Sequence, residues 1–289
     1  ETLRVTTSGV VAKDRLRDMS NPAGSEYGEE DFFQKVKQLA PGEYYLGPVV
    51  GRHVGKQEFE SGKRFDGYIR MAAPVFDSGG FAGVVALAID FRHIMEFTDH
   101  IVPTEPGMVF ARVNPDDANY TFLVGRDGTV LCHPAQYLLG GVGPDGKPVP
   151  IMDDKTYEEL VKTGMGAMNV LNMGFLDENL PKIHALASSG KSGSFTYTVD
   201  NRRIFMAYAH IPFYGSNYPK PEGYGWVGML VDIDKYHRLS EDKVKEIQLK
   251  VERWQKSSIV VVFVSLILLF IIALILARGL YRSIQKRDG

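Results

Sequence analysis

Residues 68–90 decide the fold, and they read Tyr68-Ile-Arg-Met-Ala-Ala-Pro-Val-Phe76, Asp77-Ser-Gly-Gly80 and Phe81-Ala-Gly-Val-Val-Ala-Leu-Ala-Ile-Asp90. Two apolar runs flank a short cluster of turn residues, which predicts an antiparallel β-hairpin. A proline near the end of the first run fits, because proline is tolerated at strand ends but not in central strands.

The same pattern returns about 140 residues later along the chain. There, Phe205-Met-Ala-Tyr-Ala-His-Ile-Pro-Phe213 leads through a longer loop into Trp226-Val-Gly-Met-Leu-Val-Asp-Ile-Asp234. The matching pairs are Pro74 with Pro212, Gly83 with Gly228, and Phe81 with Trp226. An imperfect repeat of this kind predicts two α+β modules, each with a central antiparallel sheet.

The remaining elements are expected around these two hairpins. Residues 121–133 predict another hairpin, with Asp127-Gly128 as its tight turn, and it would open the sheet of the second module. Helices are expected over residues 30–39, 153–163 and 172–186, and the Pro- and Gly-rich residues 140–150 are expected to form a loop.

Composition excludes several classes of protein. The 289 residues carry 33 Lys and Arg against 35 Asp and Glu, a net charge of −2, so a basic nucleic-acid binder is excluded. Aromatic residues make up 11% of the chain, which is too many for an intrinsically disordered protein. The single cysteine, Cys132, excludes an internal disulfide framework.

One segment is far more apolar than the whole chain, whose mean hydropathy is −0.12. Residues 259–277 read IVVVFVSLILLFIIALILA, with no charge and one hydroxyl, Ser265. A helix of this length spans about 28 Å, close to the hydrocarbon thickness of a bilayer. A buried core helix is the alternative, but such a helix would normally show a polar face. We therefore predict a transmembrane helix over 259–277.

Two features of the flanking residues bear on orientation and assembly. The cluster Arg278, Arg282, Lys286 and Arg287 favours a cytoplasmic C-terminus, although Lys and Arg also precede the span. Residues 240–258 predict a juxtamembrane helix with Ser240 as its N-cap. Within it, an a/d-like apolar seam would pair two copies or would pack on the chain's own domain: Val244, Ile247, Val251 and Trp254.

In order, spacing and placement, these pieces resemble the double-Cache sensor domain of bacterial transmembrane receptors. In the first module the resemblance rests on Leu3-Arg-Val5, Asp31-Phe-Phe33, Pro41-Gly-Glu-Tyr-Tyr-Leu46, Ile69 to Phe76 and Gly83 to Asp90. In the second it rests on Gly125-Arg-Asp-Gly-Thr-Val-Leu-Cys-His-Pro134 and Tyr224-Gly-Trp-Val-Gly228.

The resemblance implies an α+β fold of two PAS-like Cache modules. We expect a membrane-distal module over 1–100, without the family's long N-terminal helix, and a membrane-proximal module over 101–239. A signalling helix over 240–258, the span over 259–277 and the start of a cytoplasmic segment over 278–289 would follow. Residues 1–258 would lie in the periplasm or outside the cell, anchored in the inner membrane, and the chain would be a fragment of a longer homodimeric receptor.

The function that the resemblance implies is small-molecule sensing, with ligand in the distal module and signal passed through the juxtamembrane helix. The output would be a histidine kinase, a chemotaxis receptor or a cyclic-dinucleotide enzyme. The family's amino-acid-binding motif Arg-x-Trp-Tyr falls on Glu30-Asp31-Phe32-Phe33 here, so an α-amino acid ligand is not expected. A membrane-anchored structural or protein-interaction domain without a small ligand is the alternative.

Five residues are candidates for the ligand site. Arg70 lies inside an apolar strand, and a guanidinium there suits a bidentate grip on a carboxylate ligand. The alternative is a structural ion pair with Asp90 or another carboxylate. Tyr44, Tyr45 and Tyr68 would line the same cavity or serve as core. Asp90 would contact a ligand ammonium or only terminate its strand.

No motif supports an enzyme, a metal site or a cofactor. Neighbours on a strand point to opposite faces, so Cys132 and His133 would not meet as nucleophile and base. The other histidines lack metal-ligand spacing, and no nucleotide-binding or hydrolase motif occurs. We therefore expect a small-molecule ligand, the lipid bilayer and a second copy of the chain as partners, and no nucleic acid.

Overall fold

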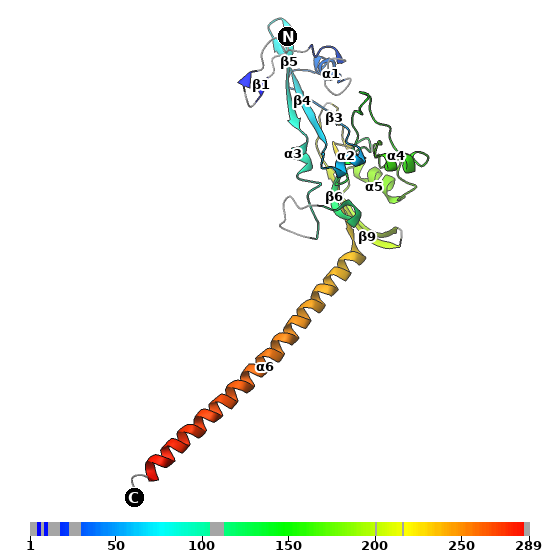
Figure 1. Cartoon of the computed structure of the whole chain (residues 1–289). Helices are drawn as coiled ribbons and strands as arrows, with labels where there is room; N and C mark the ends of the chain where they lie inside the picture. Colours follow the sequence, from blue (N-terminus) through cyan, green and yellow to red (C-terminus); the bar gives the residue numbers. More distant parts are fainter. Residues whose placement is uncertain are drawn as a thin grey trace. The chain divides into compact units, whose positions relative to one another are not determined.

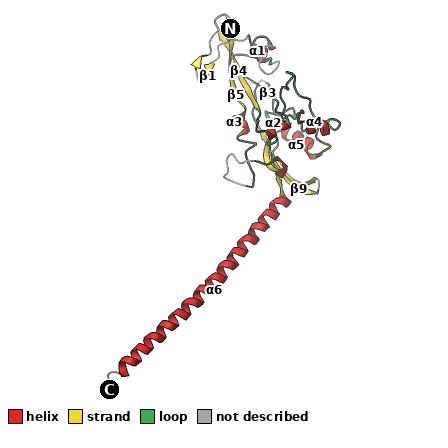
Figure 2. Ribbon diagram, in the orientation of Figure 1, coloured by secondary structure: helices red, strands yellow, loops and turns green. Residues whose placement is uncertain are grey.

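The computed structural model describes residues 5–6, 9–10, 18–22, 30–104, 113–199, 201–215 and 217–285. The chain forms two compact units, residues 1–233 and residues 234–289. The first unit is α+β with antiparallel sheets, as the sequence predicts (Figures 1 and 2).

The first sheet has the strand order β3-β4-β5, and all of its strands are antiparallel. Its strands are β3 (Tyr45–Arg52), β4 (Asp66–Asp77) and β5 (Gly80–Asp90). The β4–β5 pair runs from Tyr68↔Asp90 to Asp77↔Gly80, which confirms the hairpin predicted over 68–90. Two short strands, β1 (Val5–Thr6) and β2 (Gly9–Val10), pair with each other.

The second sheet has the order β7-β6-β10-β9-β8. Its strands are β6 (Asn119–Gly125), β7 (Val130–Cys132), β8 (Gly193–Val199), β9 (Arg202–Ile211) and β10 (Gly225–Asp232). Both hairpin predictions here are confirmed, because β6 pairs with β7 and β9 pairs with β10. Gly128 adopts a φ of +83° in the β6–β7 turn, a conformation that glycine reaches without strain.

Helices cover the sheets and the connections between strands. They are α1 (Phe32–Lys37), α2 (Lys56–Glu60), α3 (Arg92–Met95), α4 (Tyr157–Thr163) and α5 (Asn179–Ser188), with short 3-10 turns at Pro115–Asp117 and Gln136–Leu138. The helix expected over 153–163 is regular only from Tyr157. A turn over residues 154–156 precedes it, where the Asp153 carboxylate accepts from Lys155 N and Thr156 N as an N-cap side chain does.

One core joins the two sheets. It contains Ile69 and Phe91 from the first sheet region together with Val124, Met206 and Trp226 from the second. A smaller cluster lies under α1, where Phe32 and Val36 pack on Tyr45 and Ala72. The strands of the two sheets fall on either side of residue 100, but they share this core, and the division into two modules stays a prediction.

The two matching glycines of the repeat, Gly83 and Gly228, have different surroundings. A side chain at Gly228 in β10 would collide with the ring of Phe122 on the adjacent strand β6, so this glycine is needed for close packing. At the matching Gly83 in β5, open space lies where a side chain would stand. Strand β10 has neighbours on both edges, β6 and β9, whereas β5 is at the edge of its sheet.

The second unit is built on helix α6 (Ile233–Gln285), which Figure 1 draws from yellow to red. It starts seven residues before the predicted N-cap, because β10 ends at Asp232 and the helix follows without a loop. Ser240 therefore lies inside the helix, and Asp234 supplies the acidic residue in the first turn.

The apolar seam predicted on this helix is exposed in the single chain, with Ile247 60% and Trp254 72% accessible. The predicted span, residues 259–277, is helical within α6, but most of its side chains lie outside the described residues. In the described part of the chain, none of the helices combines the length and the apolar character needed to cross a membrane. The predicted transmembrane helix is therefore not confirmed.

Candidate functional site

Arg70 of β4 forms a buried ion pair, and its partner is Glu30 rather than Asp90. Arg70 Nε lies 3.1 Å from Glu30 Oε1, and Arg70 Nη2 lies 3.3 Å from Glu30 Oε2. Tyr68 OH donates to Glu30 Oε2 at 2.6 Å and accepts from Arg70 Nη2 at 3.0 Å. The guanidinium also stacks over the rings of Phe32 and Tyr68. The structural ion pair, one of the two alternatives for Arg70, is thus present.

Asp90 is engaged by the residue that follows its strand. Its carboxylate accepts from the Arg92 guanidinium, with Oδ2 2.5 Å from Nη2, and from Arg92 N at 3.0 Å. This pairing lowers the pKa of the Asp90 carboxyl. The geometry is that of a strand-terminating residue, and a role for Asp90 in binding a ligand stays a prediction.

The side chains of Tyr44 and Tyr45, at the start of β3, point to opposite sides because side chains alternate along a strand. Tyr44 OH donates to the backbone oxygen of Tyr214 at 3.1 Å, and its ring packs on Phe213. Tyr45 is buried on the other side, against α1, where burial raises its pKa to about 12. Tyr45 alone among the five candidates lines the cavity described next.

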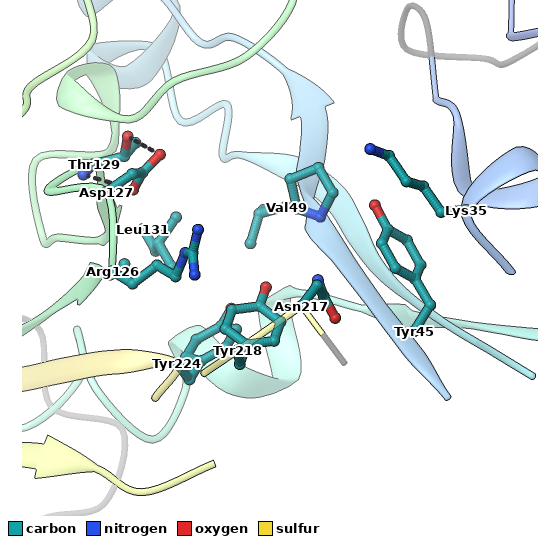
Figure 3. Close-up of a pocket in the computed structure, with 12 residues that line it drawn as sticks. Lys35, Tyr45, Val49, Arg126, Asp127, Thr129, Leu131, Asn217, Tyr218 and Tyr224 are labelled. Atoms are coloured by element: carbon teal, nitrogen blue, oxygen red, sulfur yellow. Dashed lines mark hydrogen bonds between the residues drawn. The ribbon is translucent and has the colours of Figure 1, made fainter. Parts of the chain in front are cut away.

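A cavity of about 470 Å³ lies where the first sheet meets the β6–β7 turn. Its walls come from α1 (Lys35), from β3 (Tyr45 and Val49), and from the β6–β7 turn (Arg126 among others). The loop before β10 completes the lining with Asn217, Tyr218 and Tyr224. In Figure 3, Lys35 and Tyr45 lie on one side and Arg126, Tyr218 and Tyr224 on the other, with Val49 between them.

A β-bulge and an asparagine shape one wall of this cavity. The register of β3 and β4 shifts between Leu46 and Val49, so Gly47 and Pro48 together lie opposite Arg70. Asn217 satisfies the strand at this point: its Nδ2 donates to Leu46 O at 2.6 Å, and its Oδ1 accepts from Leu46 N at 3.4 Å. The amide thereby joins the loop before β10 to the first sheet.

The cavity holds neutral phenols beside charged groups. Burial raises the pKa of Tyr218 and of Tyr224, so both remain hydrogen-bond donors at neutral pH. Asp127 accepts from Thr129 N and from Thr129 Oγ1, each at 3.0 Å, and so serves its own turn. Lys35 and Arg126 are the cations of the lining. This arrangement can bind a small polar or anionic molecule against aromatic walls.

The Cys132-His133 pair is buried in the second sheet. Burial raises the pKa of the Cys132 thiol and lowers that of His133 to about 4, so the thiol is not activated by a charged imidazole. His133 Nδ1 accepts from Ala135 N at 3.0 Å, and its ring packs on Tyr120. Among the described residues, no three His, Cys, Asp or Glu side chains are grouped so that they could hold a metal ion.

Sequence reasoning missed most of the cavity and the partner of Arg70. Glu30 is 40 residues from Arg70, and Asn217 is 171 residues from Leu46. Neither pairing has a local pattern. The Asp127-Gly128 turn was recognised as a turn, and nothing near it signals that Arg126 would face Lys35.

Comparisons with known proteins give only structural matches. No model of a known protein family matches the sequence, and no curated protein matches it. The chain is similar to the ligand-binding domain of the Pseudomonas aeruginosa PAO1 amino acid chemoreceptor PctB in complex with L-Arg, at 16% identity and a TM-score of 0.37, covering 84% of this chain and 70% of that one.

Two further structures are similar at the same level. One is a domain of a protein from Vibrio parahaemolyticus assigned to the sensory box/GGDEF family, at 14% identity and a TM-score of 0.40, covering 80% of this chain and 65% of that one. The other is the ligand-binding domain of the Pseudomonas fluorescens chemoreceptor CtaA in complex with L-leucine, at 15% identity and a TM-score of 0.36, covering 81% and 70%.

The chain spans between 55% and 64% of the length of other matched structures, among them extracellular domains assigned to histidine kinases. Of the structures named here, two are ligand-binding domains of chemoreceptors and one is a domain of a protein assigned to the sensory box/GGDEF family.

Proposed function

We propose that the chain is the extracytoplasmic sensing part of a membrane receptor, which binds a small molecule in the cavity beside β3 and passes the signal along α6. One observation carries this proposal. Tyr224 lines the cavity and directly precedes β10, and β10 ends one residue before α6 begins. A ligand that favours one arrangement of the cavity therefore acts on the strand that continues into the helix.

The mechanism is a population shift between two states of the first unit. A ligand changes the balance only by its difference in affinity for the two states. Because Asn217 ties the loop before β10 to Leu46, a ligand between these segments has a means of stabilising one arrangement over the other. The cluster around Arg70, the site that the sequence suggested, is filled by Glu30 and is the second candidate.

The setting of this sensor also belongs to the proposal. The apolar run 259–277 would anchor the chain in the inner membrane, with residues 1–258 in the periplasm and the C-terminus in the cytoplasm. A second copy would cover the exposed seam of α6. Output by a kinase, a chemotaxis protein or a cyclic-dinucleotide enzyme would lie outside these 289 residues.

A thermal-shift screen of the whole chain in detergent tests the sensor. Wild type, Val49→Trp and Arg70→Gln are compared against a broad metabolite set. Val49→Trp fills the cavity, whereas Arg70→Gln alters the second candidate. We expect a compound that raises the Tm of wild type and of Arg70→Gln but not of Val49→Trp. Compounds that lose their effect only in Arg70→Gln would move the site to the first sheet. If no compound raises the Tm of wild type, the result would favour an interaction domain without a small ligand.

Disulfide cross-linking tests the dimer. The native Cys132 is fully buried, so cysteines introduced at Ile247 or Val251 report on α6 alone. We expect a cross-linked dimer from both positions, and no cross-link from a cysteine at Lys250, which lies between them on the helix but outside the seam. Failure at both seam positions would contradict a parallel pair.

A further inference from the structure

The cavity beside β3 carries more positive than negative charge. Of its twelve lining residues, Lys35 and Arg126 are cations and Asp127 is a carboxylate, which leaves one net positive charge. Asp127 is held by two hydrogen bonds from Thr129. A ligand with one negative charge would therefore balance the lining.

The ion pairs that the two cations now form are weak. Arg126 Nη1 lies 3.5 Å from Glu222 Oε2, and these side chains are 40% and 47% exposed. Lys35 Nζ lies 3.7 Å from Asp31 Oδ2 across one turn of α1, with both side chains about half exposed. Ion pairs this open to water contribute little to stability, because solvent screens them. Exchange of Glu222 for a ligand carboxylate on Arg126 therefore costs little.

The rest of the wall is apolar or neutral. It is formed by the rings of Tyr45, Tyr218 and Tyr224 and by aliphatic side chains, among them Val49 and Leu131. The phenols donate hydrogen bonds without adding charge, and the rings offer apolar surface. A volume of about 470 Å³ lies within the usual range for a small-molecule pocket.

We infer that this cavity selects a small organic monocarboxylate with an apolar or aromatic body, held by the guanidinium of Arg126 and completed by Lys35. The inference rests on the proposed function and names the ligand class for the same site. Arginine presents a planar fork that matches a carboxylate, so a neutral isostere loses the two-point contact while it keeps the apolar one.

The test compares four carboxylates with their amides on the whole chain in detergent at constant ionic strength. The pairs are benzoate and benzamide, phenylacetate and phenylacetamide, hexanoate and hexanamide, and 3-methylbutanoate and its amide. We expect at least one carboxylate to raise the Tm while its amide does not. In Arg126→Gln this carboxylate should bind at least tenfold more weakly, and in Lys182→Gln, an exposed cation outside the cavity, it should bind as in wild type.

Two results would overturn the inference. One is that no carboxylate stabilises the chain more than its amide. The other is that a carboxylate stabilises Arg126→Gln as well as it stabilises wild type, which would place it elsewhere. If another metabolite raises the Tm of wild type but not of Val49→Trp, while none of the four carboxylates raises it, the sensor proposal is supported and the ligand class is wrong. If compounds stabilise the chain but none is sensitive to Val49→Trp, the cavity is not the binding site; if no compound stabilises the chain at all, the sensor proposal itself is contradicted.

Discussion

Glu30 and Arg70 meet as a two-point ion pair that is mostly shielded from water, with side chains 7% and 15% exposed. Tyr68 OH donates to the same carboxylate. The segment that leads into α1 thus supplies the carboxylate that Arg70 binds.

Glu30→Gln should destabilise the first unit by about 2 kcal/mol, because it leaves the guanidinium of Arg70 buried without a counter-charge. Urea unfolding followed by the fluorescence of the buried Trp226 measures this. Combining it with Arg70→Met should restore much of the loss, since a buried pair can be exchanged for apolar groups at little cost. Glu178→Gln, in an exposed helical pair, is the control and should change stability by less than about 0.5 kcal/mol. Equal losses in both variants would contradict a structural role for Glu30.

Asn217→Ala should cost about 1–2 kcal/mol, because both backbone groups of Leu46 lose their partner at the bulge of β3. Asn217→Asp should be no better, since a carboxylate cannot donate to Leu46 O. Chemical denaturation gives the loss. Asn172→Ala, which removes one long bond to Met152 O, should cost less. If hydrogen exchange at Leu46 is unchanged in Asn217→Ala, the amide does not hold this strand.

Asp99 should make the protein less stable as pH rises through weakly acidic values. Burial raises its pKa to about 6 from 3.8, although Gln136 Nε2 donates to it at 3.1 Å. Between these values the folded state keeps a proton that the unfolded state releases, so the free energy of unfolding falls with rising pH and is constant above about pH 6. Asp99→Asn should remove this trend and gain about 2 kcal/mol at pH 7. A variant with an unchanged pH profile between pH 4 and 6 would refute the assignment.

His133 should act in the opposite direction. Its pKa falls to about 4 from 6.5 because the ring is buried, so the unfolded state binds a proton first as pH drops. The stability it contributes is complete above about pH 6.5 and is lost as pH falls toward 4, by up to about 3 kcal/mol. His133→Asn keeps an acceptor for Ala135 N and cannot titrate, so its stability should depend less on pH over this range. Denaturation curves at several pH values give the comparison, and parallel profiles would count against it.

The sequence predicted the hairpins well because their signals are local. Asp77 to Gly80 and Asp127-Gly128 are turn residues between apolar runs, and neither needs distant contacts to be recognised. The start of α6 was predicted late, since Ser240 has the chemistry of an N-cap although the helix already begins at Ile233. A strand that continues into a helix leaves no loop for a sequence pattern to mark.

The candidate site was predicted only in part, because its residues come from segments that are far apart in the sequence. Arg70 was recognised as a cation inside an apolar strand, but its partner Glu30 comes from a distant segment. Tyr45 lines the cavity, yet Arg126 and Tyr224 join it only through tertiary packing. A cavity built from segments between residues 35 and 224 has no one-dimensional signature.

The two hydrogen bonds between the Asn217 amide and the backbone of Leu46 have a consequence for synthesis of the chain. The backbone of β3 at its bulge has no partner until a residue made 171 positions later has left the ribosome. Domains generally fold as they emerge, at about 5–20 residues per second, so this strand waits roughly ten seconds or more for its amide. During that interval water alone pairs with Leu46 at this edge, so the edge of the first sheet is completed only after the loop before β10 has been made.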